Sequence, residues 1–490
     1  MADYRKMWES LGMDLETHDQ LCEVLPQAFG DVFLSQENRP EAMDYYNFVI
    51  AEIHGVRPQE LIKAQEEGKK VFGTFCVYVP DELIFAANAI ATGLCGGSQF
   101  WVPGGEKVLP TNTCPLIKAS VGARLDRTCP FFRIADMYIG ETTCDGKKKA
   151  WEILGEDVPV HVMDLPQMKR EKDIKAWAEE IKELKKVIEE FTGNKVTAES
   201  LSESIKLINN KRKALSRLYE CRKADKVPIS GRDALVISQI AFYDDPARFT
   251  QMTNKLCDEL EQRIKDGISV VKEGTKRILL TGTPLAVPNW KLHNIIETSG
   301  AVVVCEEMCT GTRYFENLVD ETKTTVDEQI DALANRYMGI NCACISGTAR
   351  GTSSGTPGAH MWNYVQMDDG NWYLVDATWD DVGTSPSSRY LLVGRATKGQ
   401  YITIGEERVE YTSFSTTSAE MVGPVFILPV LAEESYADNK GKNEPAVTVV
   451  PTVTPTAAVS AEPTPTVSAE PTPTVSVIPT PTVSAEPTPT

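Results

Sequence analysis

Short apolar segments alternate along much of the chain with segments whose apolar residues recur every three or four positions. The run at 71–80 ends at a proline and predicts a buried strand, followed by a helix over 82–94 and a strand over 98–103. Further strands are expected at 136–139 and 158–163, on either side of another helix. Strands that alternate with helices predict a parallel sheet covered on both faces.

The remaining apolar patterns predict helices and a second α/β unit. Residues 1–70 have helical spacing, and 165–225 predict two long amphipathic helices whose Lys- and Glu-rich face is solvated. Strands at 277–282 and 301–305 enclose a helix at 289–298. We therefore expect two α/β lobes joined by a helical connector, with a ligand cleft at the carboxyl ends of the strands.

The chain ends in a repeat of eight residues, Val-Ser-Ala-Glu-Pro-Thr-Pro-Thr, which begins at Val459, Val467 and Val483. Pro and Thr at this density cannot build a core, so residues 436–490 are expected to form a disordered, extended tail. Such tails are typical of proteins tethered at a surface. The composition of the tail therefore indicates a surface-protein origin for the C-terminal part.

Composition narrows the classes of function. The 490 residues include 50 Lys and Arg and 69 Asp and Glu, which gives a formal net charge of −19. No basic run offers a surface for binding nucleic acid. No segment reaches the ~20 apolar residues of a membrane span. The first residues lack the apolar core of a signal peptide, so a cytoplasmic location is expected.

The 12 cysteines all lie between Cys22 and Cys344. Four of them, Cys95, Cys114, Cys129 and Cys144, fall within fifty residues, beside Gly or Pro and without a CxxC pair. Zinc-ribbon and ferredoxin sites are therefore not indicated. Two interpretations remain open on spacing alone: thiolates that converge on an iron–sulfur cluster, and buried thiols that act as small apolar residues.

Four segments carry a resemblance to a known family: 79–87, 112–118, 140–149 and 304–313. Over residues 1–344 the chain resembles the 2-hydroxyacyl-CoA dehydratase superfamily, and within it the double-cubane cluster proteins. The resemblance implies two Rossmann-like lobes and an oxygen-sensitive iron–sulfur cluster, either 4Fe-4S or double cubane. It also implies a homodimer and a separate ATP-hydrolysing activator that supplies low-potential electrons, either for radical dehydration of a 2-hydroxyacyl-CoA or for reduction of small molecules.

The resemblance also implies the ligands. Cys114 and Cys144 match the two cysteines that bind cluster iron from the first lobe. The additional ligands of a double-cubane cluster would come from Cys95, Cys129, Cys305 and Cys309. A third family ligand, in a Phe-Cys segment late in the second lobe, is absent after Cys344. The second lobe is therefore expected to be truncated. Two alternatives follow for the protein: it is still an active enzyme, or the truncation has inactivated it.

A second resemblance begins beyond that point. Segments 358–365, 371–381 and 390–393 are similar to the distal half of transglutaminase-like domains. This implies a catalytic pair, His360 held by Asp376, on adjacent strands. The helix that carries the cysteine nucleophile in that family is missing, and the same pattern also predicts a simple hairpin with aromatic cross-strand packing.

The predicted organisation has five parts: 1–164, N-terminal helices and first lobe; 165–225, connector; 226–344, truncated second lobe; 345–435, transglutaminase-like portion; and 436–490, tail. An iron–sulfur protein of the dehydratase or double-cubane type is the favoured function. The alternatives are a transglutaminase-related cysteine peptidase or amidase without its nucleophile, and a non-catalytic fusion of two incomplete domains.

Overall fold

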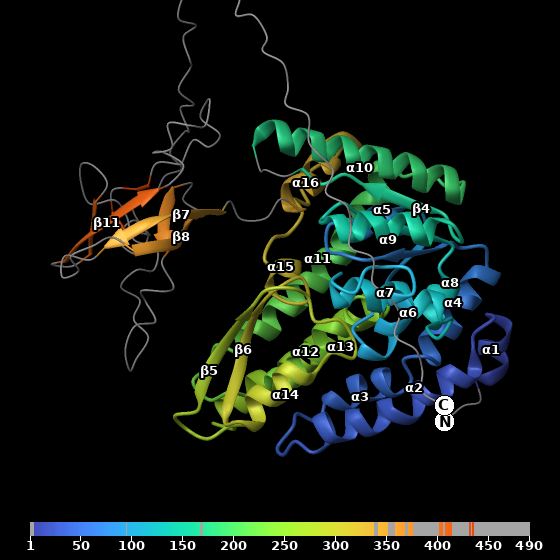
Figure 1. The fold of residues 1–490 in the computed structure, drawn as a ribbon, viewed down its shortest axis with the longest axis horizontal. Helices are drawn as coiled ribbons and strands as arrows, with labels where there is room; N and C mark the ends of the chain where they lie inside the picture. Colours follow the sequence, from blue (N-terminus) through green and yellow to red (C-terminus); the bar gives the residue numbers. More distant parts are fainter. Residues whose placement is uncertain are drawn as a thin grey trace, which may run out of the picture.

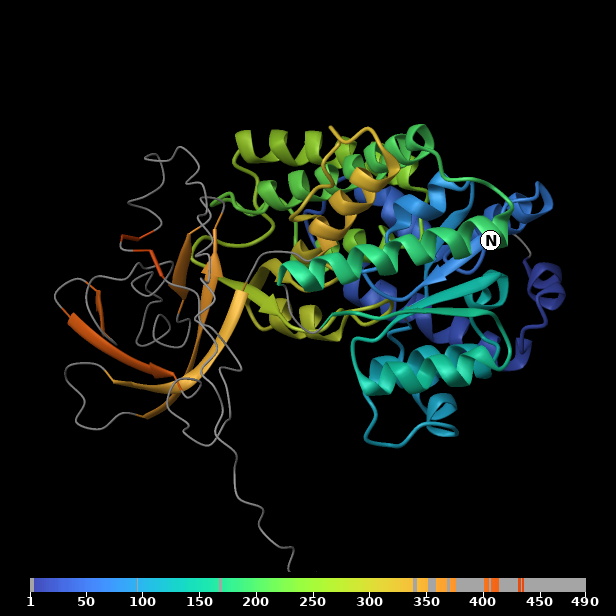
Figure 2. The same cartoon turned by 90° about the horizontal axis from the view of Figure 1, so that it is seen from above.

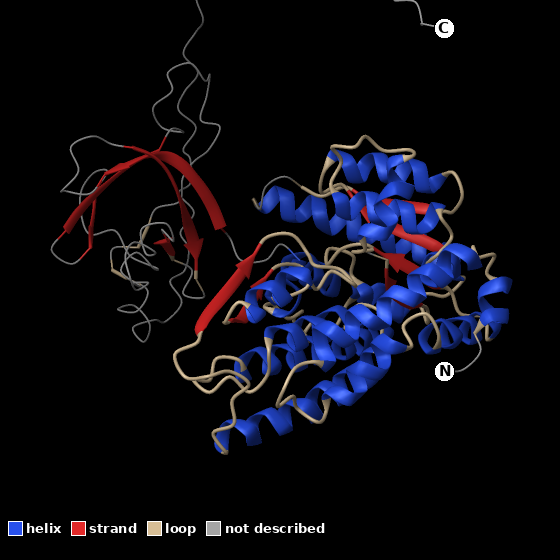
Figure 3. Ribbon diagram, turned by 60° about the horizontal axis from the view of Figure 1, so that its bottom comes forward, coloured by secondary structure: helices blue, strands red, loops and turns tan. Residues whose placement is uncertain are grey.

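The computed structural model describes most of the chain before residue 338 and a set of strands after it. The described residues are 4–94, 96–166, 170–337, 342–350, 358–367, 371–375, 401–404, 407–413, 431–432 and 434–435. Helices predominate in the first three of these ranges, and strands in those between 342 and 413 (Figure 3). Within the described residues no helix is both long and apolar enough to cross a membrane. The predicted tail lies outside the described residues.

Residues 5–66 are mainly helical, as their periodicity predicts. The helices are α1 (Arg5–Ser10), α2 (Leu15–Phe29), α3 (Met43–Ala51) and α4 (Val56–Glu66), with a short π-helical turn at Gly30–Leu34. Helix α2 begins at Leu15 because the side chain of Asp14 accepts a hydrogen bond from the backbone N–H of Thr17 at 3.1 Å.

The first lobe is built on a four-stranded parallel sheet in the order β2-β1-β3-β4, which confirms the predicted α/β class. Its strands are β1 (Val71–Thr74), β2 (Ile90–Gly93), β3 (Met137–Glu141) and β4 (Val160–Met163). The helices among them are α5 (Asp81–Ala86), α6 (Val102–Glu106), α7 (Pro115–Leu125), α8 (Pro130–Ile134) and α9 (Asp145–Gly155).

Alternation along the strands divides the core between the two faces of this sheet. Phe72 and Ile139 pack into one buried cluster with Trp177 of helix α10 (Glu171–Thr192). Tyr138, the neighbour of Ile139, packs into another with Trp151 of α9. Helices α9 and α10 accordingly cover opposite faces of the sheet, as seen from above in Figure 2.

Two predicted elements of this lobe were wrong. The expected helix over 82–94 ends at Ala86, because Asn88 adopts a left-handed conformation (φ 56°) and the chain then enters β2. The expected strand over 98–103 is instead a 3₁₀ turn, Gln99–Trp101, followed by α6. The hydroxyl of Ser98 caps this turn by accepting a hydrogen bond from the backbone N–H of Phe100.

Glycines let α6 and α7 pack with their backbones in contact. A Cβ at Gly122 of α7 would lie 1.9 Å from the carbonyl oxygen of Trp101, and one at Gly105 of α6 would lie 2.1 Å from that of Lys118. Neither backbone atom can move aside as a flexible side chain could. This close packing fixes α7, whose N-terminus carries Cys114.

We expect Gly122→Ala to lower the free energy of unfolding by about 1–3 kcal/mol, because the added methyl forces the two helices apart. Urea unfolding followed by circular dichroism measures the loss. Gly155→Ala is the matched control, since only Val160 Cγ2, at 3.8 Å, would meet the new Cβ. Equal stability of the two variants would contradict the close-packing argument.

The two long helices and the second strand–helix–strand unit are present as predicted. Helices α10 and α11 (Ala198–Cys221) lie within the range predicted as a connector, and β5 (Lys276–Thr281) pairs in parallel with β6 (Ala301–Glu307) beside α14 (Lys291–Thr298). The other helices described here are α12 (Gly231–Ile240), α13 (Pro246–Lys265), α15 (Thr312–Phe315) and α16 (Val326–Tyr337) (Figure 1). Leu279 of β5 is 59% exposed. The truncation of this lobe, expected from the sequence, stays a prediction.

The later strands form an antiparallel sheet in the order β10-β11-β7-β8-β9. They are β7 (Cys342–Arg350), β8 (Gly358–Gln366), β9 (Trp372–Val375), β10 (Tyr401–Ile404) and β11 (Glu407–Ser413). His360 lies on β8 opposite Gly347, while Asp376 lies outside the described residues. The predicted His360–Asp376 pair therefore stays a prediction.

Candidate functional site

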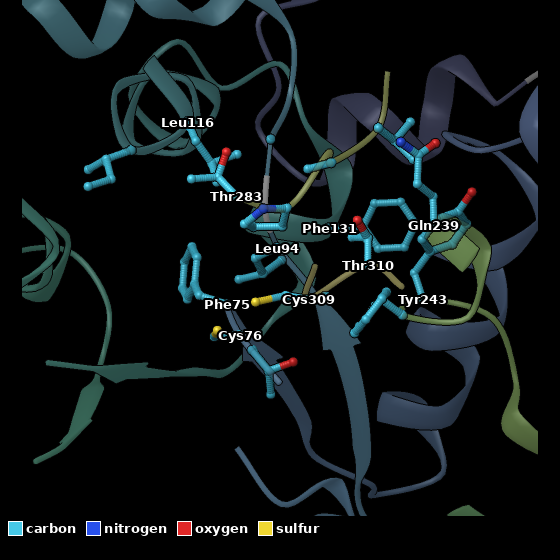
Figure 4. A pocket seen from close by; sticks show the side chains of 18 of the residues that line it. Phe75, Cys76, Leu94, Leu116, Phe131, Gln239, Tyr243, Thr283, Cys309 and Thr310 are labelled. Carbon is cyan, nitrogen blue, oxygen red and sulfur yellow. The ribbon is translucent and has the colours of Figure 1, made fainter. Parts of the chain in front are cut away.

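A cavity of about 380 Å³ lies where strands of both parallel sheets end. Residues that follow β1 and β3 line it from the first lobe, and residues that follow β5 and β6 line it from the second. This is the position at which open parallel sheets bind ligands. Figure 4 shows the cavity with Phe75 and Cys76, after β1, facing Cys309 and Thr310, after β6.

Among the described residues, five cysteines line this cavity: Cys76, Cys114, Cys129, Cys144 and Cys309. Four of the predicted ligands are thus brought together from separate parts of the chain. Cys305 is not among the lining residues, because it lies within β6, opposite Leu279, before the strand ends. Cys95 lies outside the described residues.

Cys114 and Cys144 occupy equivalent positions on two helices. Each is the N-cap residue of an 11-residue helix, Cys114 of α7 and Cys144 of α9, and each is exposed. A Cβ on Gly146 would lie 3.0 Å from Ile117 Cδ1 and 3.9 Å from Cys144 Sγ, so the two helix starts lie close together. Both cysteines therefore lie at the positive ends of helix dipoles, where a bound anionic group is favoured.

Cys76 and Cys309 form a hydrogen-bonded pair that links the two lobes. The Cys76 thiol donates to Cys309 and lowers the pKa of Cys309 to about 7, an effect that Arg313 and Lys147 reinforce. The same hydrogen bond, together with burial, raises the pKa of Cys76. The two thiols thus shift each other's pKa in opposite directions, downward for Cys309 and upward for Cys76.

Two positively charged side chains, Lys147 and Arg313, lie at the wall of the cavity. Lys147, in the first turns of α9, forms an ion pair with the buried carboxylate of Glu141, and Arg313 donates to Glu307 at 2.7 Å. Both side chains also line the cavity. Burial raises the pKa of Glu141, which Lys147 partly offsets. The cavity thus combines several sulfur donors with positive charge.

Cys129 differs from the other four cysteines. It is 7% exposed, and burial raises its pKa to about 11, so in the absence of a metal it is a neutral thiol in the cavity wall. The walls beside it are aromatic and aliphatic, with Leu94, Trp101, Phe131 and Phe132.

Sequence reasoning missed Cys76 and Lys147. The predicted strand ran to Pro80 and placed Cys76 inside it, whereas β1 ends at Thr74 and leaves Cys76 at the sheet edge. Lys147 lies in a run of three lysines, a pattern typical of a solvated surface, yet it is largely buried, with 14% of its side chain exposed. A cysteine close to the end of a predicted parallel strand was the available signal for Cys76.

The fold and the cavity define a two-lobed α/β protein with a cysteine-lined site between parallel sheets. The family model for the 2-hydroxyglutaryl-CoA dehydratase D-component matches residues 76–353. The chain therefore belongs to this family, and the superfamily resemblance seen in the sequence is confirmed.

Similar proteins include components of several enzymes. The putative dehydratase subunit YjiM of Escherichia coli K12 is 36% identical over 284 residues, which cover 58% of this chain and 73% of the relative. A benzoyl-CoA reductase subunit of Thauera aromatica is 25% identical over 263 residues (52% and 66%). The (R)-phenyllactyl-CoA dehydratase beta subunit of Clostridium sporogenes is 24% identical over 281 residues (56% and 71%).

Proposed function

We propose that this chain is an iron–sulfur protein whose cavity cysteines hold a cluster, 4Fe-4S or double cubane, that acts on a small acyl thioester. A separate ATP-hydrolysing activator would supply the electrons. The observation that carries the proposal is the convergence of five cysteines, from strand ends and helix starts of both lobes, on one cavity that Lys147 and Arg313 also line.

The residues that line the cavity fit an iron–sulfur cluster. Cys76, Cys114, Cys144 and Cys309 would hold it, with Cys129 as a fifth sulfur nearby, and thiolates are the ligands that iron–sulfur clusters require. Lys147, Arg313 and the helix starts at Cys114 and Cys144 would offset its negative charge. When bound, the cluster supplies single electrons at low potential.

Other residues of the cavity would bind and orient the substrate. The apolar walls around Phe75, Leu94 and Phe131 would exclude water, which protects reduced or radical species from side reactions. Gln239 is fixed, because its Nε2 donates to the Leu285 carbonyl at 2.8 Å and its Oε1 accepts from Trp290 Nε1 at 2.9 Å. Such a group offers a rigid polar contact within an apolar site.

The names of the relatives support the substrate class. A dehydratase of (R)-phenyllactyl-CoA and a reductase of benzoyl-CoA share a CoA thioester as reactant. We infer that this chain takes a related acyl-CoA, for dehydration or reduction, within an assembly that contains the activator and a second copy of the chain.

The test is strictly anaerobic purification of the full chain, followed by measurement of iron, acid-labile sulfide and visible absorption. We expect at least about four irons with matching sulfide, since a cubane holds four of each. The spectrum is expected to bleach when an activator of this family and ATP are added together, and to stay unchanged when either is omitted.

The double variant Cys114→Ser, Cys144→Ser is the control for cluster loading, and it should show neither iron nor bleaching. Wild-type protein that still lacks iron and sulfide after anaerobic reconstitution would refute the proposal. Iron that remains in the double variant would place the cluster on other residues.

A further inference from the structure

The N-terminal helices hold a second group of metal-binding side chains, separate from the cavity cysteines. His18 and Cys22 lie four residues apart and hence on one face of α2. His54 lies in the turn between α3 and α4. One donor atom from each residue lies within 4.8 Å of the other two.

The spacing of these atoms is close to that of a tetrahedral zinc site. Ligands at normal zinc distances are about 3.3 Å apart for two nitrogens and about 3.6 Å for nitrogen and sulfur. His18 Nε2 lies 2.9 Å from His54 Nδ1 and 3.6 Å from Cys22 Sγ. The two ring centroids lie 5.1 Å apart, so the two nitrogens face each other nearly in line, and one imidazole must turn for both to bind the same ion.

Without a metal, the three side chains pair with one another by hydrogen bonds. His18 Nε2 lies 2.9 Å from His54 Nδ1, and Cys22 Sγ lies 3.8 Å from His18 Nδ1 and 3.6 Å from its Nε2. Each ring nitrogen has either a hydrogen or a lone pair, so these contacts use both nitrogens of His18. One cation at their centre would satisfy all three donor atoms together.

Neighbouring residues hold the two histidines in place. Trp8 Nε1 donates to the backbone carbonyl of His54 at 2.7 Å, and the Trp8 ring lies 4.3 Å from the His18 ring, centroid to centroid. His18 is fully buried, while His54 and Cys22 are partly buried. These contacts fix the backbone of His54 and the position of the His18 ring before an ion binds.

We propose that His18, Cys22 and His54 bind one Zn²⁺ ion at the wall of the cavity. His54 is itself a lining residue of the cavity, so the fourth coordination position takes a water molecule or a ligand from there. Two imidazoles and one thiolate suit zinc, whereas a cubane cluster takes three or four thiolates. The site is thus independent of the cluster proposed above.

The test measures zinc and cobalt binding to the full chain. We expect one zinc per chain by elemental analysis, and a thiolate-to-cobalt charge-transfer band when Co²⁺ replaces zinc. Cys22→Ser and His54→Ala should each weaken zinc binding at least about tenfold, as loss of a ligand exceeds loss of an outer partner. Cys305→Ser is the matched control and should bind like wild type, because its half-buried thiol lies elsewhere.

Further variants distinguish whether Cys22 binds zinc or only contributes to packing. Cys22→His should keep zinc but lose the charge-transfer band, since histidine is a zinc ligand without sulfur. Zinc is counted independently of iron, and the Cys114→Ser, Cys144→Ser variant should keep both its zinc and the band. Absence of metal binding in the wild type, an unchanged band in Cys22→Ser, or loss of the band only in the cavity-cysteine variant would each overturn the proposal.

Discussion

Replacing Cys76 by serine should lower the iron and acid-labile sulfide of anaerobically purified protein at least about tenfold, because a cluster ligand is lost. The substitution removes a sulfur at the end of β1 and, with it, the hydrogen bond that stabilises the thiolate of Cys309. Serine keeps the size of the side chain, so the apolar walls of the cavity should stay intact. Iron and sulfide assays with visible spectra measure the effect.

Cys305→Ser is the control for this prediction. Cys305 is a half-buried cysteine on β6, four residues from Cys309, but it does not line the cavity. The Cys305→Ser variant should keep the iron content and the visible spectrum of the wild type. If Cys76→Ser also kept its iron, Cys76 would only support Cys309 and the ligand set would have to be drawn without it.

Glu306→Gln should destabilise the protein by about 3–5 kcal/mol, the usual result of breaking a fully buried ion pair from one side. Arg222, the C-cap residue of α11, donates to both carboxylate oxygens of Glu306, at 2.7 and 2.9 Å. Tyr219 adds a hydrogen bond at 2.5 Å and His293 one at 3.0 Å. The side chains of Arg222 and Glu306 are both 0% exposed, so the substitution leaves an uncompensated buried guanidinium.

The effect should depend on pH. Burial raises the pKa of Glu306, but Arg222 and the hydrogen bonds from Arg222 and His293 outweigh burial, and the net pKa lies well below the ordinary 4.5. A carboxyl group with a lowered pKa in the folded state contributes its full stability above the unfolded pKa and loses it as the pH falls through the folded pKa. Chemical unfolding should therefore show a large deficit for Glu306→Gln at pH 7 and a smaller one below about pH 4.

Glu220→Gln provides the comparison, because Glu220 forms an exposed ion pair with Lys223. Such pairs contribute little to stability, so this variant should unfold like wild type. A deficit of similar size in both variants, or one that does not change with pH, would show that the buried network is not what holds α11 against β6.

Much of the architecture followed from the sequence because parallel strands buried on both faces form continuous apolar runs. The runs near β1, β3, β4, β5 and β6 were found in this way. Strand β2 was missed because Ile90–Gly93 is short and follows the apolar helix α5 without a Gly or Pro signal. The backbone turn at Asn88 depends on tertiary packing and leaves little trace in composition.

The candidate site could be predicted in part, for a related reason. Cys144 and Cys309 follow strand ends that the pattern located well, and the structure places both at the cavity. Cys76 and Cys305 were misplaced by errors of a few residues in strand boundaries, which pattern analysis defines poorly. The histidines near Cys22 gave no signal, because His54 is far from α2 in sequence and joins it only in the folded chain.

The pairing of Cys76 with Cys309 across the two lobes has a consequence for the order of folding. Contacts between residues so far apart in sequence carry a large entropic cost of chain closure and form late. The first sheet can form from nearby segments, but the cavity exists only after residues beyond β6 have docked against it. We therefore expect maturation to be sequential, with the polypeptide compact before any inorganic component can be inserted.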